Sequence, residues 1–480
     1  MSALWSAEDA ARATGGRAQG DWVATGVSID SRSVAPGDLF IALSDQRDGH
    51  DFVAAALERG AAAAMVSRIP EGVSGDAPLL IVADTFQALQ DLGRAGRARC
   101  NARVIAVTGS VGKTGTKEML RTALAAQGRT HAAEKSYNNH WGVPLTLARM
   151  PRDTQFAVIE IGMNAPREIA PLAQIAQPHV GLITTVAAVH LEAFGNVTGI
   201  AREKASLAEG IRPGGTLILN RDSDTYDIQE QVARDHAVEV LSFGSAPEAD
   251  YRLISTHLSE SATTAEADCD GTPLLFRLDQ PGRHLAQNAL GVLAGVDMLG
   301  ADIARAALAL ATWSAPEGRG ARWVIDLGPG GIDGTVLLID ESYNANPAAM
   351  AAAIEVFALT QPVDGMGRVT RGRRIAVLAD MLELGPTAEA LHADLAAIPA
   401  LEQIDIVHTA GPLMRALHDR LPPAKRGQWH ADTAALAQAL PRLIDAGDVV
   451  MCKGSNGSKA GLLVDAVKKL GTPRPFAGQG

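Results

Sequence analysis

The sequence predicts an α/β protein of three domains with parallel sheets, and three observations lead to this fold class. The chain has 480 residues, more than one ordinary domain holds. Short apolar runs alternate with stretches of helical periodicity in two separate regions, which is typical of parallel strands connected by helices. A stretch rich in Pro and Gly, residues 314–320, divides these two regions.

Composition narrows the class of protein further. The 43 basic and 54 acidic residues give a formal net charge of −11, which argues against a surface built for nucleic acid or an anionic membrane. Small anionic ligands remain compatible with this charge if local sites bind them. Cys100, Cys269 and Cys452 are far apart and lack the spacing of a metal site, so a reducing compartment is expected. No signal-peptide pattern and no apolar stretch of about 18 residues is present, and a cytoplasmic protein is therefore expected.

The first expected domain covers residues 1–84 and is a small α/β unit. Its stretch "GVSIDSRSVAPGDLFIAL" predicts short strands joined by Pro-Gly turns, and "DGHDFVAAALERGAAAAMV" predicts a helix leading into a strand. A polar, arginine-bearing helix between Asp84 and Asn101 is expected to join it to the next domain.

The central domain is expected over residues 85–314 and the C-terminal domain over residues 315–480. Strands of the central sheet are predicted at Val104–Val107, Ala157–Ile161, Gly181–Val186 and Leu217–Leu219. Strands of the C-terminal sheet, which is expected to be Rossmann-like, are predicted at Val336–Ile339, Ile375–Leu378, Ile404–Val407 and Val449–Cys452. A hinge is expected between the two at residues 315–320.

The stretch "VIAVTGSVGKTGTKEML" places a glycine-rich turn between a strand and a helix. Its glycines let backbone N–H groups surround an anion, and the helix adds the positive end of its dipole. The pattern is a variant phosphate-binding P-loop, because Val107 stands where the first glycine of G-x-x-x-x-G-K-[ST] belongs. An ordinary turn that contains a lysine is the alternative. The expected ATP-binding residues of this loop are Gly109, Ser110, Val111, Gly112, Lys113, Thr114 and Gly115.

Two further side chains follow strands of the same domain and could serve a nucleotide-bound metal. They are Glu160 in "FAVIEIGMN" and His190 in "TTVAAVHLEAFG". Taken singly, a glutamate at a strand end is more often a surface group and a lone histidine is more often structural.

With this loop, "IEIGMN" and "AAVHLEAFG" in that order, the sequence resembles the Mur ligase family, ATP-dependent enzymes that form amide bonds in peptidoglycan precursor synthesis. The resemblance covers nearly the whole chain. The N-terminal "DSRSVAPGDLFIAL" and "DGHDF" look like the family's uridine-nucleotide-binding domain, which implies that Ser31 and Arg32 contact the UDP end of the substrate.

Three other segments indicate which reaction the resemblance implies. "YNNHWGVPLTL", "DESYNANPAAM" and "LADMLELG" are similar to the family member that adds D-alanyl-D-alanine to UDP-MurNAc-tripeptide through an acyl phosphate, and "DNPR" is absent. This implies a cell-wall ligase that completes UDP-MurNAc-pentapeptide. A monomer is expected only by default, because the sequence does not reveal whether the protein associates. The third residue of the tripeptide, diaminopimelate or lysine, stays open.

The resemblance also implies cofactors and roles for single residues. Lys204 in "GIAREKASL" matches a lysine that is carbamylated in several Mur ligases, the alternative being a solvated helix lysine. The implied ligands of two Mg²⁺ ions are Thr114, Glu160, His190 and Lys204 as its carbamate, with Lys113 beside them in catalysis. The implied adenosine and phosphate contacts are Asn288, Arg319 and Asp340.

Two positions depart from the family pattern. Leu285 stands where an asparagine often follows His284, and we therefore leave position 285 out of the expected site. "CKGSNGSKAGLLV" has Asn456 where the family often has arginine. The dipeptide is expected near Lys453, Ser455 and Asn456, at the carboxyl end of a strand.

Alternative functions remain open from the sequence. A Mur-type ligase that adds a diamino acid to UDP-MurNAc-dipeptide, or an amide ligase of the folylpolyglutamate or cyanophycin type, would share the P-loop. The N-terminal "DSR" and "DGHDF" segments argue against the second. A nucleotide-gated scaffold without catalysis would be favoured if Lys113, Glu160, His190 or Lys204 were missing, and all four are present.

Overall fold

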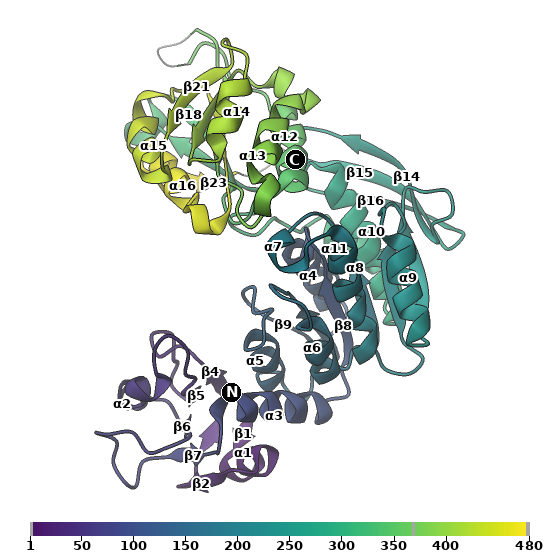
Figure 1. The fold of residues 1–480 in the computed structure, drawn as a ribbon, viewed down its shortest axis with the longest axis vertical. Coiled ribbons are helices and arrows are strands. Elements are labelled where there is room, and N and C mark those ends of the chain that lie inside the picture. Colours follow the sequence, from purple (N-terminus) through teal and green to yellow (C-terminus); the bar gives the residue numbers. More distant parts are fainter. Residues whose placement is uncertain (1–2, 367–369, 477–480) are drawn as a thin grey trace.

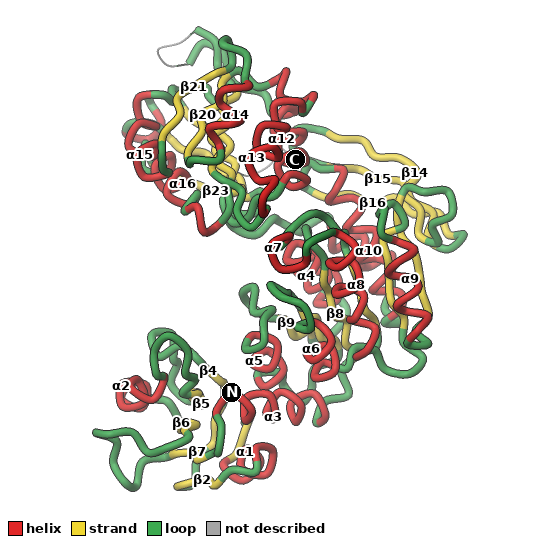
Figure 2. Tube along the Cα trace, in the orientation of Figure 1, coloured by secondary structure: helices red, strands yellow, loops and turns green. Residues whose placement is uncertain are grey.

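The computed structural model describes residues 3–366 and 370–476. The expected ends of the first and last domains, residues 1–2 and 477–480, lie outside this range. Three sheet-centred domains follow one another along the long axis of the molecule, with the N-terminal domain at one end and the C-terminal domain at the other (Figure 1). Strands and helices alternate through the central and C-terminal domains, as Figure 2 shows. The predicted three-domain α/β fold is confirmed.

The N-terminal domain contains a five-stranded sheet in the order β2-β7-β6-β5-β4, with β4 to β7 parallel and β2 antiparallel to β7. Its strands are β2 (Arg17–Gln19), β4 (Gly26–Ser28), β5 (Asp38–Ile41), β6 (Ala63–Val66) and β7 (Leu79–Ile81), and a separate pair is formed by β1 (Trp5–Ser6) and β3 (Val23–Ala24). The helices are α1 (Ala7–Thr14) and α2 (Val53–Glu58).

Helix α3 (Thr85–Ala98) connects the N-terminal and central domains. The Asp84 side chain caps its first turn by accepting from Phe86 and Gln87 N–H groups, so the helix begins where the polar stretch predicted it. Its Leu89 and Leu92 are buried in the N-terminal core. On its other face, a Cβ added at Gly96 would come within 2.3 Å of the Leu147 carbonyl oxygen on α5 (Gly142–Ala148). Only glycine permits this approach, which holds the two domains together.

The central domain contains a nine-stranded sheet in the order β16-β15-β14-β13-β12-β11-β8-β10-β9. Its strands are β8 (Arg103–Thr108), β9 (Thr130–Ala132), β10 (Phe156–Glu160), β11 (Val180–Ile183), β12 (Thr216–Asn220), β13 (Glu239–Gly244), β14 (Tyr251–Leu258), β15 (Thr263–Cys269) and β16 (Thr272–Leu278). One face is covered by α4 (Lys113–Ala125), α10 (Arg283–Met298) and α11 (Ile303–Leu310), and the other by α5, α6 (Ile169–Ala176), α8 (Val197–Ala205) and α9 (Tyr226–Asp235). The short α7 (Leu191–Phe194) precedes α8.

Two features of this sheet differ from the sequence prediction. Strands β14 to β16 form an antiparallel extension that the alternating pattern did not predict. The strand expected at Gly181–Val186 ends at Ile183, because Thr184 and Thr185 leave the sheet to bond the P-loop. Thr184 Oγ1 donates to the Val111 carbonyl over 2.6 Å, and the Ser110 N–H donates to the Thr185 carbonyl over 2.7 Å.

The C-terminal domain contains a seven-stranded sheet in the order β21-β20-β19-β22-β18-β17-β23, in which β17 is antiparallel to both β18 and β23. Its strands are β17 (Ala321–Asp326), β18 (Thr335–Glu341), β19 (Arg374–Ala379), β20 (Ile406–Ala410), β21 (Arg426–His430), β22 (Val449–Lys453) and β23 (Thr472–Pro475). Its helices are α12 (Pro347–Leu359), α13 (Ala388–Asp394), α14 (Met414–Arg420), α15 (Thr433–Ala439) and α16 (Gly461–Lys468). The strand expected at Ile404–Val407 begins two residues later, because the Ile404 N–H closes a turn on Leu401.

None of the helices in the described ranges combines the length and the apolar composition that spanning a bilayer requires.

Candidate active site

The P-loop connects β8 to α4, and two of its glycines adopt positions that no other residue could take. Gly109 and Gly112 have φ of 152° and 89°, which side chains rarely adopt. A Cβ at Gly109 would lie 2.0 Å from Thr184 Oγ1, and one at Gly112 would lie 2.7 Å from Asn288 Nδ2. The loop is therefore fitted against the end of β11 and against α10. Lys113 Nζ donates to the Gly109 carbonyl over 2.7 Å, so the ammonium lies across the loop.

Thr114 and Glu160 meet beside this loop. Thr114 Oγ1 donates to Glu160 Oε1 over 3.0 Å, and Asn138 Nδ2 donates to the same oxygen over 2.8 Å. Glu160 is 1 % exposed, and within the described ranges its Oε2 is buried without a hydrogen-bond partner. Burial lowers the pKa of Lys113, although the charge of Glu160 opposes this shift. A buried carboxylate oxygen without a donor fits a hard cation, because Mg²⁺ prefers oxygen ligands.

His190 and Lys204 lie near this group but outside the cavity lining. His190 occupies the N-cap position of α7 with φ of 52°, and its Nδ1 lies 2.6 Å from Glu383 Oε2 in the C-terminal domain. Burial lowers the pKa of His190, and the positive charges of Lys113 and Lys204 lower it further, whereas the negative charge of Glu383 opposes this shift.

Lys204, in the last turn of α8, is 1 % exposed. Burial, and secondly the charge of Lys113, place the pKa of Lys204 well below its ordinary value. In the part of the chain that the structure describes, its ammonium forms no hydrogen bond. The described residues also contain no group of three or more His, Cys, Asp and Glu side chains arranged to hold a metal by themselves.

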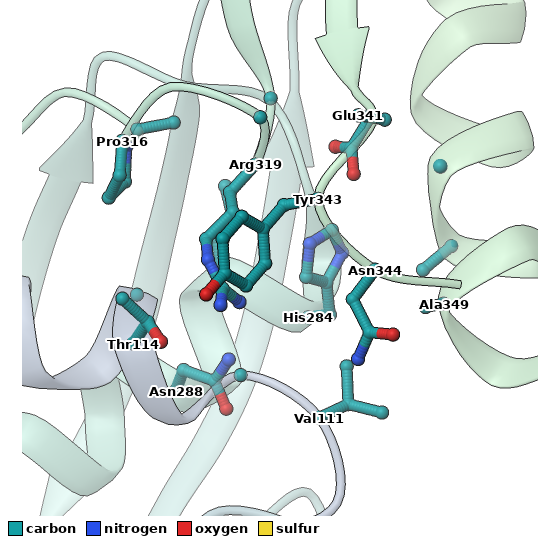
Figure 3. A pocket seen from close by; sticks show the side chains of 18 of the residues that line it. Val111, Thr114, His284, Asn288, Pro316, Arg319, Glu341, Tyr343, Asn344 and Ala349 are labelled. Carbon is teal, nitrogen blue, oxygen red and sulfur yellow. The ribbon is translucent and has the colours of Figure 1, made fainter. Parts of the chain in front are cut away.

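A cavity of about 280 Å³ opens between the central and C-terminal domains. Figure 3 shows side chains from both domains around it, including Val111 and Thr114 of the P-loop and Tyr343 of the C-terminal domain. Of the expected ATP-binding residues, the structure brings these to the lining: Ser110, Val111, Gly112, Lys113, Thr114, Gly115, Asn288 and Arg319. Gly109 and Asp340 do not line it.

Arg319 stacks its guanidinium on the Tyr343 ring, 4.1 Å from the ring centroid (Figure 3). The turn that carries Arg319 is fixed by the buried Asp340. Its Oδ2 accepts from the Gly318 N–H over 3.1 Å and its Oδ1 accepts from Ser342 Oγ over 2.7 Å. Asp340 therefore shapes the Arg319 turn in this structure.

The residues expected to bind the dipeptide separate in the structure. Lys453, at the end of β22, lines the cavity, and its ammonium donates to Glu341 Oε2 and to the Asn344 carbonyl, both over 3.1 Å. Ser455 Oγ accepts from the Leu382 N–H over 3.0 Å, behind the lining. Asn456 is exposed.

Ser31 and Arg32 lie in the N-terminal domain on the loop between β4 and β5, outside the cavity. Arg32 is exposed and pairs with Asp30 over 2.8 Å. Its side-chain hydrogen bond lowers the pKa of Asp30 to about 2.

Several lining residues were not predicted from the sequence. They are Ser136, Asn138, His284, Leu285, Glu341, Tyr343 and Asn344. Glu341, Tyr343 and Asn344 come shortly after Asp340 in the motif "DESYNANPAAM". Because Asp340 was expected at the site, this motif could have predicted that they lie near it. Leu285 was left out because it departs from the family pattern, but its place on the first turn of α10 brings it to the cavity.

The P-loop lies at the end of a parallel strand, and a second α/β domain lines the other side of its cavity. These features place the chain in the class of multidomain α/β proteins with a P-loop. Family models match three consecutive segments: the Mur ligase family catalytic domain at residues 23–97, the Mur ligase middle domain at residues 107–296, and the Mur ligase glutamate ligase domain at residues 330–456.

Similar proteins extend this match over nearly the whole chain. A UDP-N-acetylmuramoyl-tripeptide--D-alanyl-D-alanine ligase of Escherichia coli is 34 % identical over 93 % of this chain and 94 % of its own length. The enzyme of that name from Bacillus subtilis is 32 % identical over 93 % of each chain. The chain therefore belongs to the Mur ligase family.

Solved structures agree with this assignment. A crystal structure of MurF from Acinetobacter baumannii superposes with a TM-score of 0.81 at 28 % identity, covering 97 % of this chain and 99 % of that one. MurF of Thermotoga maritima, solved in complex with ADP, superposes with a TM-score of 0.73 at 25 % identity, covering 93 % and 97 %.

Proposed function

We propose that this chain is an ATP-dependent ligase that joins D-alanyl-D-alanine to UDP-MurNAc-tripeptide and so completes the peptidoglycan precursor UDP-MurNAc-pentapeptide. The observation that carries the proposal is the cavity in which the P-loop faces Arg319, Tyr343 and Lys453 of the C-terminal domain. Relatives bearing the name of this activity are similar over more than nine tenths of the chain.

ATP would occupy this cavity. Its phosphates would lie on the loop from Gly109 to Gly115, where Lys113 would exchange the Gly109 carbonyl for phosphate oxygens. Asn288 and Arg319 line the same space, and Asp340 would act through the turn that it holds. The ADP complex of the similar Thermotoga maritima protein supports a nucleotide here.

The residues present fit Mg²⁺. The unpaired Oε2 of Glu160 and the Thr114 hydroxyl are oxygen ligands beside the P-loop, and His190 and Lys204 would complete two ion sites. Bound Mg²⁺ would neutralise the charge on the phosphate oxygens.

Lys204 would join these ligands as a carbamate. Burial favours its neutral amine, whose nitrogen would bond to the carbon of CO₂ and release a proton. The product is an anion, so it would replace the repulsion between Lys204 and Lys113 by an attraction.

The reaction would proceed in two steps. An oxygen of the tripeptide's terminal carboxylate attacks the γ-phosphorus of ATP, ADP leaves, and an acyl phosphate forms. The amine of the dipeptide then attacks the acyl carbon, phosphate leaves with the bonding electrons, the nitrogen loses a proton, and the amide remains. Lys113 stabilises the phosphoryl charge in the first step, and closure of the two domains excludes water that would hydrolyse the acyl phosphate.

Each substrate would have its own domain. Residues 1–84 would hold the UDP end with Ser31 and Arg32, and residues 85–314 would hold ATP. Residues 315–480 would hold the dipeptide near Lys453, Ser455 and Asn456. The chain would act in the cytoplasm as a monomer, and residues 315–320 would serve as the hinge.

Release of inorganic phosphate from ATP tests this function. We expect release that requires both UDP-MurNAc-tripeptide and D-alanyl-D-alanine, with UDP-MurNAc-pentapeptide as the product. Release driven by a diamino acid with UDP-MurNAc-dipeptide would instead assign the chain to another reaction of the family. No new amide with any of these substrates would refute a ligase.

A further inference from the structure

His190 and Glu383 connect the central and C-terminal domains. His190 directly precedes α7, which lies at the edge of the central domain that faces the C-terminal domain (Figure 1), and Glu383 lies on the turn after β19. Their Nδ1 and Oε2 atoms are 2.6 Å apart. Both residues have a left-handed backbone, with φ of 52° and 62°, a conformation that is unfavourable for residues other than glycine. Two strained turns, one in each domain, thus present these side chains to each other.

The Glu383 turn is held in place by its own domain. The Met381 N–H donates to His392 Nε2 over 2.9 Å, and the Leu382 N–H donates to Ser455 Oγ over 3.0 Å. These bonds fix the two residues immediately before Glu383. The C-terminal domain therefore fixes the backbone beside Glu383, and the carboxylate reaches His190 from this turn.

The contact also selects one form of the histidine ring. A carboxylate oxygen can only accept, so at 2.6 Å the Nδ1 must carry the hydrogen. In the neutral ring this leaves Nε2 with its lone pair, as a metal ligand requires. Carboxylates that bond the second nitrogen of a histidine ligand commonly fix its tautomer and orientation.

We propose that Glu383 is a positioning residue for His190, which it holds in the tautomer and orientation that bind the cation of the P-loop site. The inference rests on the proposed function, because it takes His190 as a ligand of that cation. Glu383 comes from the C-terminal domain, so the central domain's cation site is fully organised only while the two domains hold this arrangement. Cation affinity and the position of the C-terminal domain are thereby coupled.

Mn²⁺ binding to the full chain, followed by electron paramagnetic resonance with a non-hydrolysable ATP analogue present, tests the coupling. We expect Glu383→Ala to weaken Mn²⁺ binding about 10-fold to 100-fold, the usual effect of losing such a carboxylate. Glu383→Gln should stay within a few-fold of the parent, because its amide oxygen can still accept from Nδ1. Glu389→Ala, which removes an exposed glutamate of the same domain, serves as the control.

A second measurement reports the ring directly. In ¹⁵N-histidine spectra of the metal-free protein, assigned with His190→Asn, the His190 signal should show a hydrogen on Nδ1 in the parent and a mixture of tautomers in Glu383→Ala. Unchanged Mn²⁺ affinity and an unchanged tautomer in Glu383→Ala would overturn the positioning role, while the proposed ligase would stand if Glu160→Ala still abolished Mn²⁺ binding. A parent protein that binds neither Mn²⁺ nor the ATP analogue would overturn the proposed function itself.

Discussion

Thr114 Oγ1 donates to Glu160 Oε1 over 3.0 Å, and this bond joins the first turn of α4 to the end of β10. Asn138 adds a second donor to the same oxygen, whereas Oε2 has no donor in the described ranges although it is buried. A carboxylate left in this state destabilises the protein unless a cation balances it. The arrangement of Thr114 and Glu160 therefore favours binding of a cation, at a cost to the stability of the metal-free protein.

Glu160→Gln tests whether this carboxylate serves turnover and lowers the stability of the metal-free protein. We expect ligase turnover to fall at least about 10²-fold, since one charged group that stabilises the phosphoryl oxygens through the ion is lost. Without metal, we expect the thermal midpoint of unfolding to rise, because an amide is cheaper to bury than an unpaired carboxylate. Phosphate release and calorimetry in EDTA measure the two effects. Glu134→Gln, at an exposed position, should change neither, and a lower midpoint for Glu160→Gln would contradict the unpaired state of Oε2.

Lys113→Met tests the division of substrates between domains. We expect turnover to fall by about 10²-fold or more, because the methionine cannot stabilise phosphoryl oxygens. Binding of UDP-MurNAc-tripeptide, measured by calorimetry, should stay close to that of the parent, since the UDP end is expected in another domain. The exposed Lys469→Met is the matched control. Loss of both turnover and UDP-substrate binding would show that the two ligands share one site.

The sequence predicted the parts of this fold that repeat a local pattern. Strands such as β8 and β22 are short apolar runs followed by helical periodicity, and they appeared within one residue of the expected bounds. The antiparallel extension of β14 to β16 was missed because β14 and β16 place the apolar Ile254 and Leu275 at exposed positions, so that of the three strands only β15 alternates as a half-buried strand should. Antiparallel pairing also depends on a partner strand that local periodicity does not reveal.

The candidate site was predictable where a motif fixes the backbone. The glycines of the P-loop determine the path of the chain, and Lys113 and Thr114 follow from that path. The contact of Glu383 with His190, and the position of Tyr343 across the cavity from the P-loop, depend on how one domain lies on another, and no local pattern encodes this. Ser455 had a strand-end signal like that of Lys453, yet its hydroxyl turned to the Leu382 backbone and away from the cavity.

Lys117→Met should destabilise the chain and loosen one wall of the site. Lys117 is fully buried, and its ammonium donates to the Ala133 carbonyl over 2.7 Å and contacts Glu118 Oε1 at 2.7 Å. The methionine would leave these groups without their partner, at a cost of about 3 kcal/mol in the free energy of unfolding.

Urea denaturation measures this cost, with the exposed Lys135→Met as the control, expected within about 0.5 kcal/mol of the parent. The segment that Lys117 holds leads to Ser136, whose hydroxyl lies 3.3 Å from that of Thr114, so turnover should fall as well. Equal stability of the two variants would mean that Lys117 contributes nothing beyond packing.

His408 should make the stability of the protein depend on pH. It is 4 % exposed, and its Nδ1 accepts from the Gln428 N–H over 2.9 Å, a bond between β20 and β21 that requires an unprotonated nitrogen. Burial lowers the pKa of His408 to about 4, from an ordinary value of 6.5. The unfolded chain therefore takes up a proton near pH 6.5 and the native chain only near pH 4. The stabilisation, about 3 kcal/mol, is complete above pH 6.5 and is lost as the pH falls to 4.

The thermal midpoint between pH 7 and pH 4.5 tests this dependence in the parent and in His408→Asn. The amide oxygen of asparagine can still accept from Gln428 but does not titrate, so the variant's midpoint should fall less on acidification than the parent's. His236→Asn, at an exposed histidine, should follow the parent. If all three proteins lose the same number of degrees, the acid sensitivity of the fold originates at other groups and the Nδ1 bond of His408 does not control it.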